Sequence, residues 1–320
     1  MREIGIIEGI CAANETMRPF TFPFVLLFAA VLNCEAANGD TLELLRRDAP
    51  LPSKMTDRIG VGEQKRYRIQ TEHYEITATQ FEGGNFVSDR LEHLTSVLTR
   101  LVAEYGKEVN SEPAPHRHRV ILYRDHQEYT LHLFQIDRNI ARTNGYYSTP
   151  KKTAYFPSLE EKVLFHEGTH QIFAERFFHE KAPAFRNNFW VVEGIALFME
   201  TLKIEDECYK IGNILANRLY SAKKYRFEQN HRLPIRKLTA MSAAEIQTNV
   251  DLQKIYSQSA TLVHWLMFAE EGRYRPALFE LLRRTYLGSA TPETLSELTG
   301  LSYDELDKKY EEFLKTIPDE

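Results

Sequence analysis

The sequence predicts an α+β fold, with a mixed sheet and helices in the first half of the chain and helices alone in the second. Two observations predict the sheet: residues 74–79 alternate between apolar and polar side chains, and residues 119–123 form a second short strand pattern. Between them, residues 87–105 repeat apolar side chains at helical spacing. Asp125 is expected to begin a helix that runs through residue 134. Beyond about residue 208 the pattern is helical, with a good helix start at residues 302–305, and no strand is expected there.

The composition is that of a globular protein. The 320 residues are 43% hydrophobic and 27% charged, with 15 Gly and 13 Pro, which excludes a collagen-like, low-complexity or largely disordered chain. The formal net charge of -5 provides no basic field that would attract nucleic acid or an anionic membrane surface. Nucleic acid is therefore not an expected partner. The oligomeric state stays open.

The amino terminus has the layout of a secretory signal peptide. Met17, a candidate for the true start, and one Arg precede an apolar run over residues 19–32, and cleavage is expected near Ala36 or Ala37. The protein is therefore expected to be exported, either periplasmic or secreted. The alternative is an uncleaved leader that anchors the chain in a membrane. Loss of the leader would leave Cys208 as the one remaining cysteine, so no internal disulfide is expected.

Four segments are expected along the chain. Residues 1–37 form the signal peptide, and residues 38–68, which are polar and contain prolines, form a linker with no sustained period. A catalytic subdomain follows over residues 69–204, and a helical subdomain over residues 205–320 completes the chain.

A short motif, His-Glu-Gly-Thr-His from His166 to His170, carries the chemistry. Two histidines four residues apart project from one face of a helix, so they can hold one metal ion. Glu167 then faces the open coordination position as a candidate general base. The motif lies in an apolar helix expected over residues 163–178, and a capping-box sequence at residues 158–161 precedes that helix.

Glu193 is the candidate third ligand. It interrupts a strongly apolar helix expected over residues 190–203, where an unpaired buried carboxylate would be costly and metal ligation would relieve that cost. Gly194 and Ala196 leave room for close approach of another helix. Two imidazoles and one carboxylate leave a fourth tetrahedral position for water, as a catalytic zinc site requires. The alternative is that Glu193 is exposed on a surface helix.

The His-Glu-Gly-Thr-His motif and the segment around Glu193 together resemble the gluzincin zinc metallopeptidases, in particular the peptidase-MA-like group, which includes bacterial exported domains of unassigned function. The resemblance covers roughly residues 70–315. It implies a zincin-like fold and one Zn²⁺ held by His166, His170 and Glu193. It also implies that Glu167 takes a proton from the attacking water and later delivers it to the leaving amine.

The donor that stabilises the oxyanion is less specified. The resemblance implies that Tyr256 is this donor, with His231 and Tyr209 as alternatives. An aromatic core residue with no role in catalysis is an equally good interpretation of Tyr256. In a gluzincin the substrate backbone would lie along an exposed edge strand, here near residues 144–147 of a hairpin.

Two features depart from the gluzincin pattern. Leu197 stands where many relatives place an acidic residue that orients a zinc-binding histidine, and Glu200, on the same helical face, is the expected substitute. The interval between His170 and Glu193 is also longer, with an insertion that begins at residues 181–183. Other histidines are expected to be surface or core residues rather than ligands: His116, His118, His126, His132 and His264.

The predicted function is that of an exported zinc endopeptidase or aminopeptidase acting on a peptide or protein. A catalytically silent binding or scaffold protein of the same fold is one alternative, although the intact Glu167 argues against it. A zinc hydrolase of a non-peptide amide is the other, because the same ligands would support that reaction.

Overall fold

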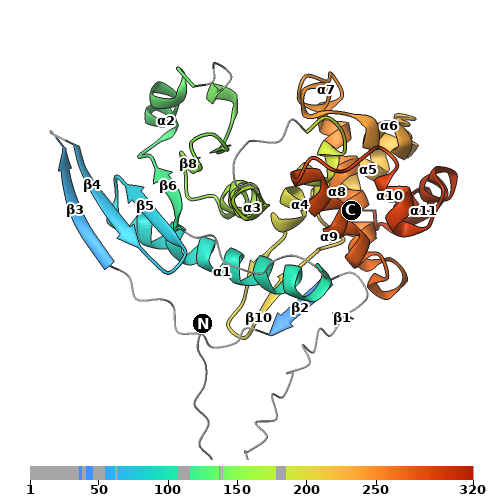
Figure 1. The fold of residues 1–320 in the computed structure, drawn as a ribbon, viewed down its shortest axis with the longest axis horizontal. Coiled ribbons are helices and arrows are strands. Elements are labelled where there is room, and N and C mark those ends of the chain that lie inside the picture. Colours follow the sequence, from blue (N-terminus) through green and yellow to red (C-terminus); the bar gives the residue numbers. More distant parts are fainter. Residues whose placement is uncertain are drawn as a thin grey trace, which may run out of the picture. The chain divides into compact units, whose positions relative to one another are not determined.

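The computed structural model has an α+β architecture (Figure 1), so the predicted fold class is correct at that level. The residues that it describes belong to the compact unit that runs from Asn33 to Glu320. They are residues 36–37, 41–45, 55–61, 64–106, 116–136, 138, 140–177 and 185–319. Apart from the backbone of Ala36–Ala37, the predicted signal peptide lies outside the described residues, as does the expected insertion at 181–183.

A six-stranded mixed sheet forms the first half, as predicted, with the strand order β3-β4-β5-β6-β8-β7. The central strands β5, β6 and β8 run parallel, and the outer neighbours pair antiparallel. Within the described part of the chain, β7 pairs only with β8 and therefore forms one edge of the sheet. The strands are β3 (Met55–Val61), β4 (Gln64–Gln70), β5 (Tyr74–Ala78), β6 (His118–Leu122), β7 (Tyr146–Ser148) and β8 (Thr153–Phe156).

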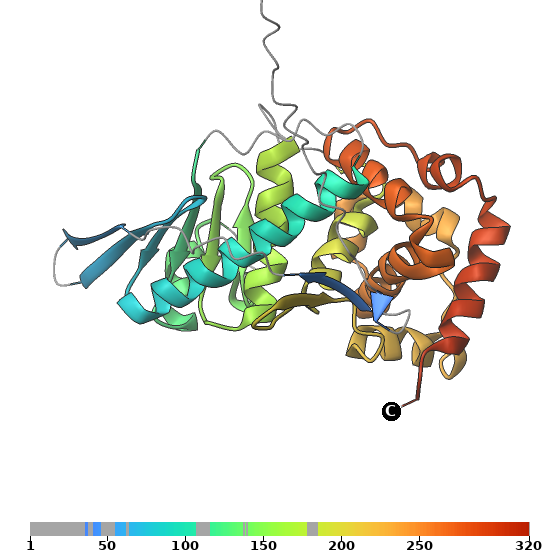
Figure 2. The ribbon, with the colours of Figure 1, turned by 90° about the horizontal axis from the view of Figure 1, so that it is seen from below.

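A long helix, α1 (Phe81–Tyr105), packs on β4 and β5 and extends from the sheet to the helical half of the chain (Figure 2). It begins six residues before the predicted start. The sequence pattern did not indicate this first part because Gly83 and Gly84, which are poor helix formers, lie in the first turn. A Cβ atom on Gly84 would lie 2.3 Å from Cδ1 of Ile69, so this glycine allows the helix to lie close to β4.

The expected linker over residues 38–68 is a wrong prediction, because it contains strands of both sheets. A four-stranded antiparallel sheet joins β1 (Ala36–Ala37), β2 (Thr41–Leu45), β10 (Cys208–Ile211) and β9 (Lys203–Ile204), in that order. Leu42 and Leu44 of β2 are buried in the core. The expectation of no strand beyond residue 208 fails for the same reason, since β10 is stabilised by β2, far away in the sequence.

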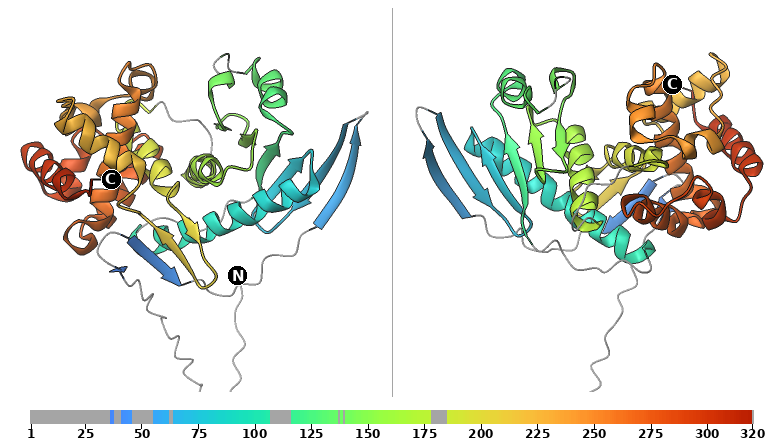
Figure 3. Two further views of the ribbon diagram at one scale, coloured as in Figure 1. Left: turned by 180° about the vertical axis from the view of Figure 1, so that it is seen from behind. Right: turned by 45° about the horizontal axis from the view of Figure 1, so that its top comes forward.

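Helices dominate the second half, seen from two further sides in Figure 3. Central to them is α8, which packs on both α4 and α5. A capping box between Ser302 and Glu305 begins α11, as the sequence predicts. The helices are α4 (Phe189–Met199), α5 (Asn217–Phe227), α6 (Ile235–Ala240), α7 (Ala243–Gln247), α8 (Leu252–Gly272), α9 (Arg275–Tyr286), α10 (Thr294–Thr299) and α11 (Tyr303–Thr316).

The remaining elements of the first half lie before and after the edge hairpin. Asp125 caps α2 (His126–Leu133) by accepting a 2.8 Å hydrogen bond from the Glu128 N–H, as predicted, and η1 (Ile140–Arg142) follows. The hairpin of β7 and β8 is also as predicted. Among the described residues, no helix combines the length and apolar character needed to cross a membrane. The division at residue 204 into two subdomains stays a prediction.

A partly buried ion pair connects the turn before β5 to α1. The Glu92 carboxylate accepts hydrogen bonds from the backbone N–H of His73 at 2.9 Å and from its ring nitrogen Nδ1 at 2.6 Å. The hydrogen bond that His73 donates to Glu92 raises the pKa of His73. Burial opposes the charge of Glu92, yet its hydrogen bonds with His73 and Thr71 hold the pKa of Glu92 below its ordinary value.

Replacing His73 with Gln is expected to lower the free energy of unfolding by about 1 kcal/mol at pH 6, since the pair is partly exposed on the histidine side. Because the pKa of His73 is raised in the folded protein, the stabilisation by this histidine is complete below pH 6.5. It is lost as pH rises through the pKa of His73 in the folded protein. The lowered pKa of Glu92 means that its contribution is lost as pH falls below 4.5.

Denaturant unfolding of the wild-type protein and of His73→Gln between pH 4 and 9 measures the difference in their free energies of unfolding. In a Glu92→Gln background the effect of His73→Gln should lose its pH dependence. A difference that grows as pH rises above 7 would contradict the assignment.

Candidate metal centre

The helix that carries the motif, α3 (Glu161–Phe177), packs against α1 and the β7–β8 hairpin. Gly168, in the middle of the motif, faces α1: a Cβ atom there would lie 2.7 Å from Leu94 Cδ2 and 2.8 Å from Leu91 Cδ2. The predicted capping box does not form at this start. The helix begins at Glu161, and the Glu161 carboxylate pairs with Arg90 Nε of α1 at 2.5 Å.

The helix that carries Glu193, α4, is buried along its whole length. It lies against α8 so closely that a Cβ atom on Gly194 would be 2.8 Å from the backbone oxygen of Ser259. The predicted close approach at Gly194 is therefore confirmed. Glu193 is only 5% exposed, which excludes the alternative of a surface residue. The packing of α4 on both α3 and α8 brings this carboxylate to the motif.

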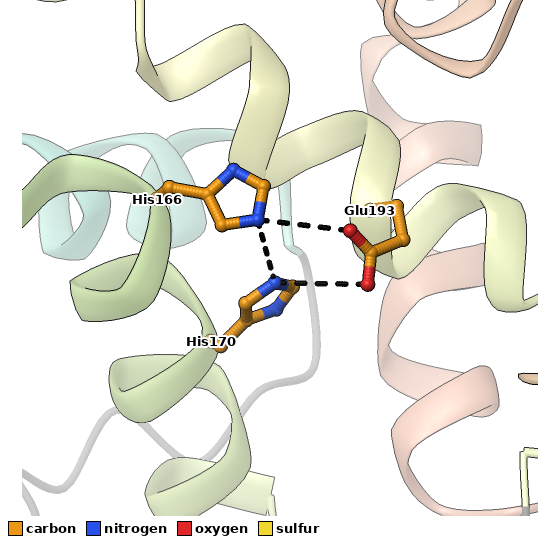
Figure 4. A group of neighbouring side chains, drawn as sticks. All are labelled: His166, His170 and Glu193. Atoms are coloured by element: carbon orange, nitrogen blue, oxygen red, sulfur yellow. Dashed lines mark hydrogen bonds and ion pairs between the residues drawn. The ribbon is translucent and has the colours of Figure 1, made fainter. Parts of the chain in front are cut away.

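His166, His170 and Glu193 converge on one point (Figure 4). The Nε2 atoms of the two histidines are 3.2 Å apart. The carboxylate presents one oxygen to each ring, with Oε2 3.6 Å from Nε2 of His166 and Oε1 3.9 Å from Nε2 of His170. These are the only three His, Cys, Asp or Glu side chains in the described part of the chain that group in this way.

These distances fit a metal ion. A tetrahedral zinc ion with nitrogen and oxygen ligands at 2.0 to 2.2 Å places neighbouring ligand atoms about 3.3 to 3.5 Å apart. The two nitrogens and the carboxylate are already within a few tenths of an ångström of that spacing. Two imidazoles and one carboxylate also form the donor set of a catalytic rather than a structural zinc site.

Glu200 orients the first histidine. Its Oε1 atom lies 2.8 Å from Nδ1 of His166, so it holds the ring with Nε2 turned toward the cluster. Glu200 therefore contacts the histidine as expected, and its role in place of the acidic residue missing at Leu197 stays a prediction. Such a carboxylate fixes the ring tautomer and makes the opposite nitrogen a better metal ligand.

Glu167 is held by the edge strand of the sheet. Its Oε2 atom accepts a 2.9 Å hydrogen bond from the backbone N–H of Tyr147 in β7. A Cβ atom on Gly145 would lie 2.6 Å from Val163 Cγ1 and 2.9 Å from Glu167 Cγ. Glycine at this position therefore allows β7 to lie close enough to α3 for the backbone to reach the carboxylate.

Burial and charge shift the pKa values of the whole group. Burial raises the pKa of Glu167 to about 7, with a further increase from the neighbouring Glu193. Burial opposes a charge on His166, but hydrogen bonds to Glu193 and Glu200 raise its pKa to about 10. Burial lowers the pKa of His170 to about 4. Glu193 has a lowered pKa despite its burial, because His166, His170 and Tyr256 stabilise the anion. The centre thus favours a cation.

Tyr256 is the one oxyanion donor candidate that lies at the centre. It lines the same cavity as the cluster, and its hydroxyl hydrogen-bonds the Glu193 carboxylate. Burial and that carboxylate raise the pKa of Tyr256 far above its ordinary value, so the hydroxyl stays protonated and can donate. The alternatives lie elsewhere: Tyr209 hydrogen-bonds Nδ1 of His93 at 2.9 Å, and His231 lines a separate cavity between α5 and α11.

The cavity at the centre has a volume of about 470 Å³ and contains residues that the sequence did not indicate. Tyr286, at the end of α9, and Phe189, at the start of α4, both form its wall. No local pattern distinguishes these two aromatic residues from ordinary core residues. Residues 145–147 of the predicted edge strand line the cavity as expected.

The scattered histidines do not join the cluster, as predicted. His116 and His118 contact the buried Glu175 instead, with nitrogen to oxygen distances of 3.1 and 2.9 Å. His264 packs among aromatic rings, 4.6 Å from the centre of Phe268.

Comparison with known families adds one finding. Residues 162–286, which include the motif, Glu193 and Tyr256, match a family described only as a protein of unknown function, DUF1570. A search of curated proteins finds no match.

Proposed function

We propose that the protein is a zinc-dependent metallohydrolase with a zincin-like fold that cleaves peptide bonds. The observation that carries the proposal is the convergence of two histidines and Glu193 at ligand spacing, with all three side chains lining one cavity. Glu167 lies on the same helix and lines that cavity. The sequence resemblance to gluzincins supports the same reaction class.

His166, His170 and Glu193 would hold the ion, and Glu200 would keep the His166 ring aligned. A bound zinc ion would supply Lewis-acid activation of water and of the scissile carbonyl. Glu167 would accept the proton of the attacking water, because its carboxylate lies beside the two histidines on the same helix and lines the cavity. It would then deliver that proton to the leaving amine. Tyr256, which stays protonated, would donate to the developing oxyanion.

The peptide class of substrate is supported by β7. Among the described residues β7 pairs with β8 alone, and on its other side the Tyr147 N–H already donates to Glu167, so a peptide would pair there with the remaining backbone groups. An extended peptide could pair with this edge and bring its backbone past Glu167. A non-peptide amide would use the same side chains but would have no need of a strand edge.

Zinc content and cleavage of a mixed peptide library test the proposal in wild-type protein and in Glu167→Gln. We expect one zinc per chain in both, and a loss of cleavage of about 100- to 10,000-fold in the variant. His166→Ala is the matched control, since it should lose zinc as well as activity. Absence of zinc from the wild-type protein would refute the proposal.

Two other results would favour one of the alternative functions. Zinc binding by wild type without cleavage of any peptide or other amide would favour a silent scaffold. Cleavage of small amides but of no peptide would favour the non-peptide hydrolase.

Glu200→Gln is expected to weaken zinc affinity by about 10- to 100-fold, because the ring of His166 loses its charged partner. Competition with a zinc-binding dye measures the affinity. Glu207→Gln changes an exposed carboxylate elsewhere and should leave the affinity at the wild-type value. Equal affinity in all three proteins would exclude an orienting role for Glu200.

Gly145→Ala is expected to keep zinc but to lower kcat at least about 10-fold, because an added Cβ would push β7 away from Glu167. Zinc titration and steady-state kinetics separate the two effects. Gly300→Ala is the control for a glycine outside the cavity lining: no atom lies within 4 Å of its added Cβ, although its positive φ of 70° adds a modest cost in stability. A Gly145→Ala variant with wild-type kcat would show that the position of β7 does not limit the reaction.

A further inference from the structure

The cavity beside the cluster has a polar end and an uncharged end. Among the described residues that line it, the charged or metal-ligating groups are His166, Glu167, His170 and Glu193, all at the cluster itself. The other lining side chains are uncharged, and many are apolar or aromatic. A charged substrate side chain placed there would lose hydration without gaining a partner, which is costly.

Three rings, called here the aromatic wall, close the uncharged end: Phe185, Phe189 and Tyr286. The centre of the Phe185 ring is 5.4 Å from that of Phe189 and 5.5 Å from that of Tyr286. Phe189 and Tyr286 are 5% and 2% exposed, so both are held in place by the core. The Ala243 N–H donates a 2.9 Å hydrogen bond to the Phe185 carbonyl, which ties the wall to α7.

The aromatic wall lies beside the part of α3 that follows the motif, because the centre of the Tyr286 ring is 6.0 Å from that of Phe173 and 5.9 Å from that of Phe177. Gly145 contacts α3 beside Glu167, and the Tyr147 hydroxyl reaches 3.5 Å from Glu175, two turns further along α3. The cavity follows the same direction, from Glu167 to Ala174. A residue next to the scissile bond would therefore extend its side chain toward the wall.

We infer that the aromatic wall, with Ala174, Val192 and Ala243, forms a subsite for a bulky apolar or aromatic side chain next to the scissile bond. This inference rests on the proposed peptidase function. It adds a substrate class, namely peptides with a large uncharged residue at one flanking position. Pockets of this size and lining commonly bind apolar groups, and filling one stabilises the complex by removing apolar area from water.

The test begins with mass-spectrometric mapping of cleavage sites in a mixed peptide library by the zinc-loaded, full-length protein. We expect Phe, Leu or Tyr to be enriched at one of the two flanking positions. Matched peptides with Phe, Lys or Gly at that position then give kcat/KM values. Phe should exceed Lys and Gly by about 10- to 100-fold.

Ala243→Phe is expected to fill the cavity and lower the Phe to Gly ratio of kcat/KM at least about 10-fold. Ala244→Phe, the next residue of α7, is exposed and does not line the cavity, so its ratio should equal that of wild type. Gln247→Phe approaches the same cavity from one turn later and should reproduce the effect of Ala243→Phe. Thermal unfolding verifies that each variant is folded.

Cleavage without preference at either flanking position would overturn the subsite while leaving the proposed function intact. A preference for a charged residue would do the same, as would wild-type ratios in both Ala243→Phe and Gln247→Phe. Failure of zinc-loaded wild type to cleave any peptide would instead remove the proposed function and the subsite together.

Discussion

The close packing of α4 between α3 and α8 is the constraint on which the centre depends. Glu193 reaches the two histidines because Gly194 lets the backbone of α4 approach that of α8. A larger side chain at Gly194 would meet the Ser259 carbonyl, which is main chain and cannot move aside as the end of a flexible side chain can. Ligand spacing is therefore a property of the core, set by residues that would never contact a metal.

The same packing creates an electrostatic problem. Glu167 and Glu193 are both buried within a few ångströms of His166, and Glu200 adds a third carboxylate. Burial of several like charges is costly unless a cation or proton compensates them. In the protein alone, His166 carries that positive charge, and a divalent ion would serve the same purpose at the centre of the cluster. The electrostatics and the spacing of the three side chains thus both favour a cation at the centre of the cluster.

The two halves of the chain contribute different parts of the candidate site. The sheet supplies the edge strand, whose Tyr147 N–H holds Glu167, and the helical half supplies Tyr256 and Tyr286. Only α3 and α4, which lie between the halves, carry the cluster itself. A substrate that follows β7 would therefore contact both halves, with its reacting bond near the helices and one side chain in the uncharged end of the cavity.

By itself, the sequence determined the features that depend on residues close together along the chain. The spacing of His166 and His170 is a property of one helix, and the caps at Asp125 and Ser302 need only the next three residues. The sequence also indicates Glu193 as a site residue, because a carboxylate buried in an apolar helix is costly unless it has a partner. Tertiary structure decided the rest. The strand β2 forms by pairing with β10, which is far away in the sequence, so the residues of β2 alone predict a linker. Likewise the approach of β7 to Glu167 and the aromatic wall come from packing between distant segments, whose residues carry no local signal of it.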